Sequence, residues 1–317
     1  MYQVVGVVTI GAASVIYDVK DTVLNVRRVL KMLEPGCSAS HDRRMLRERE
    51  MLAGFDHPNI VRVVFAGRTT DDRQLPYYVM EKLEGLDLRR WLRGGRFPVE
   101  RALSIAADIL KGLGAAHARG ILHRDVKPDN IFLQRAPESP WYETKLLDFG
   151  CAKWNHQPSS DQLLGTINYV APELMDGAEA SEKSDVYATG VTLYEMLTAH
   201  HPYGRLPIST RRGPPPPLSK YIEANDDLIE LVCDALSPLP DARIPSARVF
   251  AFRLAQVRYR VANCPLVEGT TDIDTLVAEK MPSTQRMPSA PRFDVVAEDD
   301  EQSDDEGEEE ERSPLSS

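Results

Sequence analysis

Apolar residues in the first part of the chain occur in short runs that are rich in β-branched side chains. Such runs are typical of strands, whereas one longer segment, which starts at Ser40 and ends near Gly54, has the composition of a helix. The predicted strands are VVGVVTI, SVIYDV, RRVLKML, NIVRVVFAGR and LPYYVMEKL, and the predicted helix is SHDRRMLREREMLAGF.

From about residue 87 onward, apolar residues instead recur at spacings of three and four, which predicts amphipathic helices. These segments are LRRWLRG, VERALSIAADILKGLGAAHARG, SDVYATGVTLYEMLTA, NDDLIELVCDALS and PSARVFAFRLAQVRYRVA. The pattern predicts an α+β architecture, with a small strand-rich lobe followed by a larger helical lobe. A proline run at 211–219 interrupts the helical part, and we interpret it as a stiff connector rather than an SH3-type ligand.

The periodic pattern stops after about residue 262, where Ser, Pro, Thr, Asp and Glu dominate. This composition cannot offset the entropy cost of ordering, so we expect a disordered acidic tail over 265–317. Residues 298–311 carry eleven acidic residues and no basic one, so the formal net charge of -10 leaves the rest of the chain near neutral. The body therefore offers no electrostatic reason to bind nucleic acid or an anionic membrane, while the tail is either a solubilising extension or a contact for basic proteins.

The four cysteines are far apart and form no CxxC pair, so they suggest neither a zinc site nor a disulfide framework. A reducing, cytoplasmic location follows as the expectation. The opening apolar run has about fourteen residues, fewer than the roughly 20 that a membrane-spanning helix needs. We therefore expect two strands there, joined by a turn at residues 11–14, and no membrane span.

Two segments carry the residue types that phosphoryl transfer requires. HRDVKPDNIFL contains Asp125, Lys127 and Asn130, and KLLDFG places Asp148 at the end of an apolar run. Transfer of a phosphoryl group from ATP needs a carboxylate for the hydroxyl proton, cations for the phosphate charge, and oxygen ligands for Mg²⁺.

These two segments and GTINYVAPE occur in the order and spacing of one family, and over residues 2–260 the chain resembles a eukaryotic-type protein kinase domain. Lys127 and the GT pair before NYVAPE resemble the serine/threonine branch, and the style of the chain is similar to bacterial Ser/Thr kinases. The resemblance implies the two-lobed kinase fold, with an antiparallel sheet and one main helix in an N-lobe (2–83) and a helical C-lobe (84–260). It also implies ATP and Mg²⁺ as cofactors, and Ser/Thr hydroxyls of proteins as acceptors.

The same resemblance assigns roles to the matching residues. Asp125 is expected to orient the acceptor hydroxyl and take its proton, and Lys127 to contact the γ-phosphoryl. Asn130 and Asp148 are expected to hold Mg²⁺. Arg124 stands where many kinases pair an arginine with a phosphate on the activation segment, and Ser159 or Ser160 would carry that phosphate here. In addition, Asp185 would brace the catalytic loop, Glu173 would pair with Arg243, and Thr166 would lie near Asp125 and Lys127.

In the first lobe, RVLKML resembles the family's lysine strand and makes Lys31 the cation for the α- and β-phosphates. Counting back from HPNIV selects Glu48, not Glu50, as the acid that pairs with this lysine. Glu48 and Leu52 lie one helical turn apart, so both face the strands.

YYVMEKLEGLDL resembles the hinge that holds the adenine. Met80 is the expected residue at the back of the pocket, the backbones of Glu81 and Leu83 would bind adenine, and Asp87 would lie near the ribose. Four further residues are expected to form the apolar walls of the pocket: Ile16, Val29, Phe132 and Leu147.

GAASVIY resembles the glycine-rich loop that covers the phosphates, but it is about two residues shorter. Gly11 matches the first glycine, whereas Ala13 and Ser14 stand where glycines are usual. A tighter turn exposes fewer backbone N–H groups to phosphate, so we expect a modest affinity for ATP. The cations and acids that stabilise the transition state remain, so we expect an active kinase. The alternative is a pseudokinase scaffold with weak or no transfer.

Overall fold

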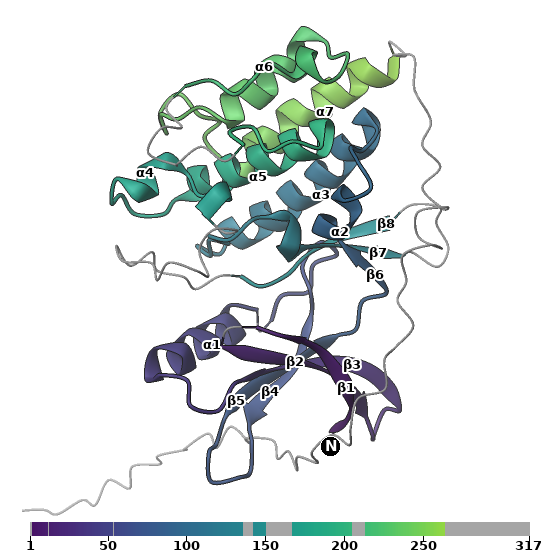
Figure 1. The fold of residues 1–317 in the computed structure, drawn as a ribbon, viewed down its shortest axis with the longest axis vertical. Coiled ribbons are helices and arrows are strands. Elements are labelled where there is room, and N and C mark those ends of the chain that lie inside the picture. The colour runs from purple at the N-terminus through teal and green to yellow at the C-terminus, as the bar shows by residue number, and fades with distance from the viewer. Residues whose placement is uncertain are drawn as a thin grey trace, which may run out of the picture.

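The structure is a computed structural model that describes residues 2–11, 13–52, 54–135, 142–149, 167–204 and 213–263. Figure 1 shows two bodies, a twisted sheet with one helix and a larger group of helices. The sheet is antiparallel throughout, with the strand order β1-β2-β3-β5-β4. Its strands are β1 (Tyr2–Ile10), β2 (Ser14–Asp21), β3 (Val26–Leu33), β4 (Val63–Arg68) and β5 (Pro76–Glu81), and α1 (Ala39–Leu52) packs against β3, β4 and β5.

The second body contains helices and a small antiparallel sheet of order β6-β7-β8. Its elements are β6 (Gly85–Asp87), α2 (Leu88–Leu92), α3 (Val99–His117), β7 (Ile131–Arg135), β8 (Tyr142–Leu146), α4 (Pro172–Met175), α5 (Glu182–Thr198), α6 (Asp226–Ala235) and α7 (Ala247–Asn263). Short 3₁₀ turns occur at Pro128–Asn130, Ile167–Tyr169 and Leu218–Lys220.

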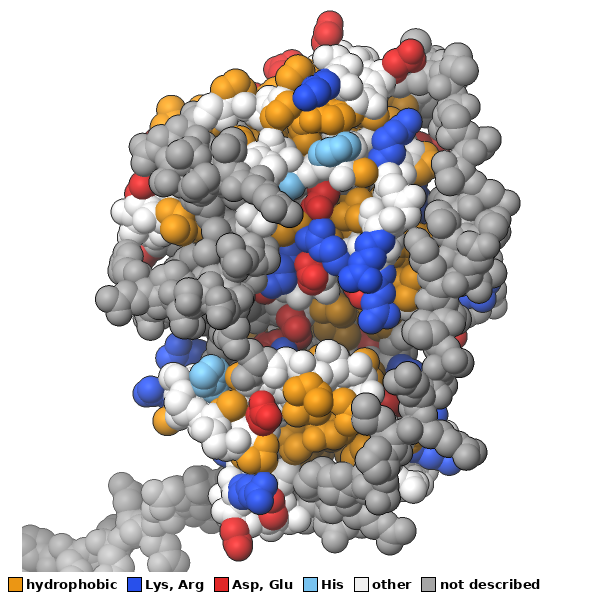
Figure 2. All heavy atoms as spheres, in the orientation of Figure 1, with side chains coloured by type: hydrophobic (Ala, Val, Ile, Leu, Met, Phe, Trp, Pro, Cys, Tyr) orange, Lys and Arg blue, Asp and Glu red, His pale blue; other side chains and the backbone are white. Residues whose placement is uncertain are grey.

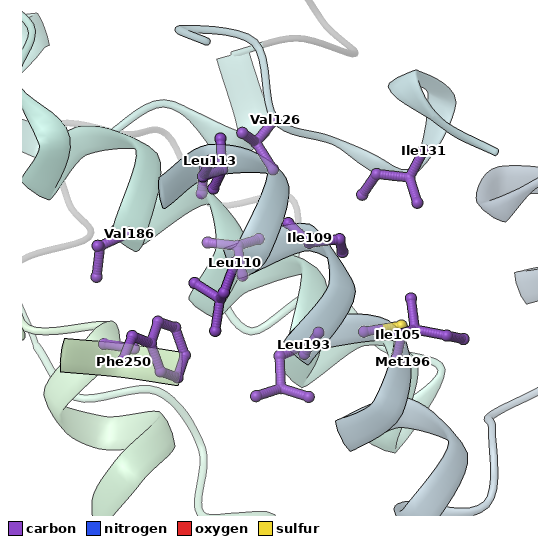
Figure 3. Close-up of a cluster of buried hydrophobic side chains, with 14 of the residues drawn as sticks. Ile105, Ile109, Leu110, Leu113, Val126, Ile131, Val186, Leu193, Met196 and Phe250 are labelled. Carbon is purple, nitrogen blue, oxygen red and sulfur yellow. The ribbon is translucent and has the colours of Figure 1, made fainter. Parts of the chain in front are cut away.

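The core of this second body lies around α3 and α5. Figure 3 shows side chains from both helices meeting, together with Phe250 of α7. Residues at spacings of three and four on α3, among them Ile109 and Leu113, are completely buried, as the sequence pattern predicts. Burial of each such side chain contributes roughly 1.5–3 kcal/mol, so this core fixes the frame from which the neighbouring loops project.

The strands and helices expected from the pattern are present, with two differences. α1 begins at Ala39, one residue before Ser40, and the backbone N–H groups of His41 and Asp42 bind the carbonyl of Ser38. The strand predicted to begin at Asn59 begins only at Val63, because residues 59–61 pair with β8 instead: Leu146 N donates to Asn59 O, and Val61 N donates to Leu146 O.

The proline run, predicted to be a stiff connector, is described by the structure from residue 213 onward. Pro215 is buried, and the carbonyl of Pro216 accepts a hydrogen bond of 2.9 Å from Tyr194 of α5. These residues pack against the helical body, which supports a connector. The predicted disordered tail at 265–317 lies outside the described residues, and within the described ranges no helix is long and apolar enough to cross a bilayer.

Candidate active site

The loop between α3 and β7 is fastened to α5 at its beginning. The N–H groups of His123 and Arg124 donate to the two carboxylate oxygens of Asp185 at 2.9 and 2.8 Å. Asp185 is 1% exposed, and His117 of α3 also lies 2.8 Å from it. Arg124 has a φ of 65°, a backbone conformation that residues other than glycine rarely adopt, so these hydrogen bonds hold a strained turn in place. The brace predicted for Asp185 is therefore present.

Asp125 follows this turn and is bound by two side chains from its own loop. Lys127 Nζ and Asn130 Nδ2 each lie 2.8 Å from Asp125 Oδ2, and Asn130 Nδ2 also donates to the Asp125 carbonyl at 2.9 Å. Both donors use the same carboxylate oxygen, so Oδ1 is not engaged by them. Because the amide nitrogen of Asn130 faces Asp125, its amide oxygen is the atom available to a metal ion.

Asp148 is brought next to this loop by the pairing of β7 and β8. Leu147 N donates to Asn130 O at 2.9 Å, and the Leu147 carbonyl lies 3.0 Å from His123 Nε2. Asp148 comes directly after Leu147 and has a φ of 45°. One carboxylate and one amide oxygen fit the hard cation Mg²⁺, which takes only one or two protein carboxylates. Among the described residues, no group of three or more His, Cys, Asp or Glu side chains forms a metal cluster of another kind.

Lys31 of β3 connects the two bodies. Its Nζ lies 2.9 Å from Glu48 Oε1 on α1 and 2.8 Å from Asp148 Oδ1. Burial alone would lower the pKa of Lys31, but the nearby carboxylates outweigh burial and hold this pKa well above its usual value. Burial likewise opposes the charge of Asp148, yet the attraction of Lys31 keeps the pKa of this carboxyl below its usual value. Both groups are therefore charged at neutral pH.

Glu48 has a second partner that the sequence did not indicate. Tyr78 of β5 donates from its hydroxyl to Glu48 Oε1 at 2.9 Å, and Tyr78 is fully buried. Burial raises the pKa of Glu48 above its usual value, although Lys31 acts in the opposite direction. Glu50, by contrast, is exposed. The choice of Glu48 over Glu50 as the partner of Lys31 therefore agrees with the structure.

Several residues predicted to form the apolar pocket share one cluster. Val29, Leu83 and Leu147 pack against a buried group that includes Met80 and Tyr78. The two remaining wall residues lie on strands of the two bodies. Ile16 of β2 is opposite Lys31 in the register, and Phe132 of β7 is opposite Asp87.

The hinge segment after β5 is tied to both bodies by ion pairs. Glu81 Oε1 lies 2.9 Å from Lys145 Nζ on β8, and Lys82 Nζ lies 2.6 Å from Asp18 Oδ2 on β2. The N–H of Glu81 already donates to Arg62 O at 3.0 Å, so this residue can offer a bound base only its carbonyl. Neither lysine was singled out in the sequence.

Asp87 occupies a structural position in addition to its predicted place near a ribose. Its side chain accepts the N–H of Arg90 at 2.8 Å and caps the N-terminus of α2. An aspartate directly before LRRWL is a recognisable N-cap signal, so this contact could have been predicted from the sequence.

The shortened loop forms a tight turn, as expected. Gly11 N donates to Ser14 O at 2.8 Å, and Ile10 pairs with Val15. The Ala13 carbonyl accepts the N–H of Glu34 at 3.0 Å, which ties the turn to the segment that follows β3.

In the helical body, Glu173 receives two hydrogen bonds from the guanidinium of Arg243, at 2.7 and 2.9 Å. This is the predicted structural pair. Cys151, Ser159, Ser160 and Thr166 lie outside the described residues.

Charged side chains gather where the two bodies face each other, as Figure 2 shows. Lys31 forms ion pairs with both Glu48 and Asp148, and a lysine, a glutamate and an aspartate of this kind are typical of protein kinases. Residues 2–245 match the family model described as protein kinase domain, and the chain belongs to this family.

Bacterial Ser/Thr kinases are among its relatives. The chain is 32% identical over 261 residues to the serine/threonine-protein kinase PknB of Mycolicibacterium smegmatis, covering 78% of this chain and 41% of that protein. It is 38% identical over 205 residues to Pkn1 of Myxococcus xanthus, covering 61% of this chain and 29% of that protein. The matches thus span about two fifths or less of these relatives.

A solved structure shows the same fold. The PknI kinase domain of Mycobacterium tuberculosis superposes with a TM-score of 0.64 at 29% identity, covering 80% of this chain and 95% of that one. The kinase fold expected from the sequence is therefore confirmed.

Proposed function

We propose that this protein is a serine/threonine protein kinase that transfers the γ-phosphoryl group of ATP to hydroxyl groups of protein substrates. The observation that supports this most strongly is the meeting of two separate sets of charged and polar groups. Lys31, Glu48 and Asp148 form one connected set, and Asp125, Lys127 and Asn130 form the other. The Leu147–Asn130 backbone hydrogen bond holds the two sets side by side.

Each group has a chemical task in this proposal. Bound Mg-ATP supplies the phosphoryl group and a cation that neutralises its charge. Asp148 and the amide oxygen of Asn130 hold the metal, and Lys31 binds the α- and β-phosphates. Asp125 orients the acceptor hydroxyl and takes its proton through the oxygen that Lys127 and Asn130 leave open. Lys127 forms an ion pair with Asp125 and would contact the γ-phosphoryl.

The nucleotide itself would lie against the apolar cluster around Met80. The carbonyl of Glu81 and the backbone of Leu83 would bind the adenine, because the Glu81 N–H is already used. Val29 and Leu147 pack from the two bodies on this cluster and would enclose the base. We infer that Ile16 and Phe132 complete its apolar walls.

A pseudokinase scaffold is the second candidate, and the tight turn at Gly11–Ser14 is the observation that favours it. With Ala13 O bound to Glu34, the turn has little freedom to fold over phosphates. Both sets of groups are present, however, and besides holding Mg-ATP they stabilise the transition state of the transfer. The turn therefore lowers ATP affinity in our proposal and leaves transfer in place.

Two measurements on the purified chain separate these candidates. We expect Mg-ATP to raise the unfolding temperature, because a ligand that binds only the folded state stabilises it. We further expect labelled phosphate to appear on serine and threonine, not tyrosine, of a general protein acceptor. Stabilisation by Mg-ATP without any phosphate transfer would support the scaffold instead.

A further inference from the structure

A second group of polar side chains, two of them buried, meets the catalytic loop at its Asn130 end. It consists of Arg89 on α2, Asp129 in the loop, Tyr169 in the 3₁₀ turn Ile167–Tyr169, and Glu195 on α5. Tyr169 and Glu195 are 5% and 8% exposed, so their polar atoms depend on protein partners.

Arg89 is the centre of this group. Its Nη1 donates to Glu195 Oε1 at 2.8 Å, and its Nε donates to Asp129 Oδ2 at 3.3 Å. Its Nη2 donates to the Tyr169 hydroxyl, which in turn donates to the second carboxylate oxygen of Glu195. The guanidinium carbon also lies 5.6 Å from the centre of the Tyr169 ring. One side chain thus links α5, the catalytic loop and the Tyr169 turn.

Through these contacts, α5 is bound to both ends of the catalytic loop. Asp185, near the beginning of α5, binds the N–H groups of His123 and Arg124 directly. Glu195 lies ten residues further along the helix, about 15 Å away, and reaches Asp129 only through Arg89. Asp125 lies between these two attachments, and Asn130 directly follows the second.

The group is stable only as a unit. Without Arg89, the Glu195 carboxylate would be a buried charge with no cation, which is strongly unfavourable. Burial and the neighbouring Glu195 raise the pKa of Tyr169, so the phenol keeps its proton and remains a donor. A guanidinium group, with donors fixed in a planar fork, can serve all three acceptors, whereas a lysine ammonium cannot match that geometry.

We propose that Arg89 is a positioning residue for phosphoryl transfer, which aligns Asp125 and Asn130 by tying the Asp129 end of their loop and Tyr169 to α5. This inference rests on the proposed kinase activity. Arg89 is expected to affect the transfer step more than nucleotide binding, because the adenine and phosphate contacts come from the hinge and Lys31, and only the metal contact of Asn130 depends on this loop.

The first test compares kcat and the KM for ATP in the wild type, Arg89→Met and Arg93→Met. Arg93 is an exposed arginine at the end of the same helix and serves as the matched control. We expect Arg89→Met to lower kcat about tenfold or more, since small misplacements of catalytic groups have such effects. The KM for ATP should change less than about twofold, and Arg93→Met should behave as the wild type. Millimolar guanidinium should restore part of the lost kcat in Arg89→Met alone.

A second variant keeps the inference testable if Arg89→Met does not fold. Asp129→Ala removes only the link to the loop, and the Asp129 side chain is 51% exposed. We expect a lower kcat for Asp129→Ala too, and this single variant is sufficient if Arg89→Met does not fold. Where Arg89→Met folds, we expect the double variant to be no slower than Arg89→Met alone, because both changes break one chain of contacts. Unchanged kcat in Asp129→Ala, or losses that multiply in the double variant, would overturn the inference.

The result for the wild type distinguishes the two proposals. A wild type that transfers no phosphate overturns the kinase activity and this inference together. An active wild type with equally active Arg89→Met overturns the inference alone.

Discussion

Glu48 receives a hydrogen bond from Lys31 and another from Tyr78 on the same oxygen, deep between α1 and the sheet. Because two buried donors bind the same carboxylate oxygen, the Glu48 side chain is fixed in one position, and its hydrogen bond fixes Lys31 as well. The cation therefore stands beside Asp148 before any nucleotide binds. Such preorganisation lets a charged group act on the transition state without moving first.

A substitution at Glu48 should therefore impair transfer, whereas the same substitution at Glu50 should not. Glu48→Gln removes the negative charge that orients Lys31, and we expect kcat/KM for ATP to fall about tenfold or more. Glu50→Gln makes the same chemical change on an exposed side chain two residues away. Steady-state kinetics on both variants check this, and equal activity of the two would contradict the assigned pair.

The ion pairs of Asp18 with Arg27 and Lys82 should make the free energy of unfolding depend on pH. Burial alone would raise the pKa of Asp18, but hydrogen bonds from Arg27 and Lys82 outweigh it and hold this pKa below its usual value of 3.8. A depressed folded-state pKa stabilises the protein above the unfolded-state value, and this contribution is lost as pH falls through the folded-state value.

We therefore expect Asp18→Asn to cost about 0.5–1 kcal/mol of unfolding free energy at pH 7, and less at about pH 2 or in high salt. Urea unfolding at both pH values measures this. Asp72→Asn, which changes an exposed acid in the turn between β4 and β5, should cost little at either pH. A loss for Asp18→Asn that does not shrink on acidification would contradict the assigned ion pairs.

Individual contacts were predictable where two residues have a fixed spacing. Counting along the sequence selected Glu48, and the acid before α2 carried an N-cap signal. Tyr78 carried no such signal, because a tyrosine in an apolar strand looks like any other core residue. Arg89 was hidden for a different reason: its partners are 40, 80 and 106 residues away in the chain.

At the scale of elements, β6 follows the hinge and pairs so closely with β7 that there is no room for a side chain at Gly85. This residue has a φ of 149°, and a Cβ atom there would lie 2.0 Å from the carbonyl oxygen of Leu133 on β7. The backbones of β6 and β7 pair at this point, so neither strand can move away without breaking the sheet.

Gly85→Ala should consequently destabilise the fold by about 2 kcal/mol or more, from backbone strain and the clash together. Gly213→Ala is the matched control, because no atom lies within 4 Å of a Cβ placed there. Chemical unfolding of both variants checks the prediction. A Gly85→Ala protein as stable as the control would mean that β6 does not pair with β7 as described.

The long helices were the easiest elements to predict, since α3, α5, α6 and α7 all repeat apolar residues over several turns. The β6-β7-β8 sheet was not predicted as a unit. Its strands have three to five residues, which is too short for an alternating pattern to emerge. Residues 59–61 were assigned to a strand of the first lobe because their composition cannot show that they pair with Leu146.

At the scale of the whole molecule, the candidate site exists only because two bodies meet. Lys31 and Glu48 come from the sheet and α1, while Asp125, Asn130 and Asp148 come from the helical body. Sequence motifs predicted both sets of residues and the family, but not the links that hold the bodies together. One such link is the ion pair between Glu81 of β5 and Lys145 of β8, two strands that are remote in sequence, and Lys82 in the adjoining hinge pairs in turn with Asp18 of β2.

The most direct measurement of the central claim is the transfer of labelled phosphate from Mg-ATP to a protein acceptor by the wild type and by Asp125→Ala. Asp125 accepts hydrogen bonds from both Lys127 and Asn130, and its carboxylate is the only proton acceptor that the proposal uses. The account predicts steady incorporation by the wild type and loss of about a hundredfold or more in Asp125→Ala, with binding of Mg-ATP retained in a thermal unfolding assay. Equal incorporation by the two proteins, or none by the wild type, would contradict it.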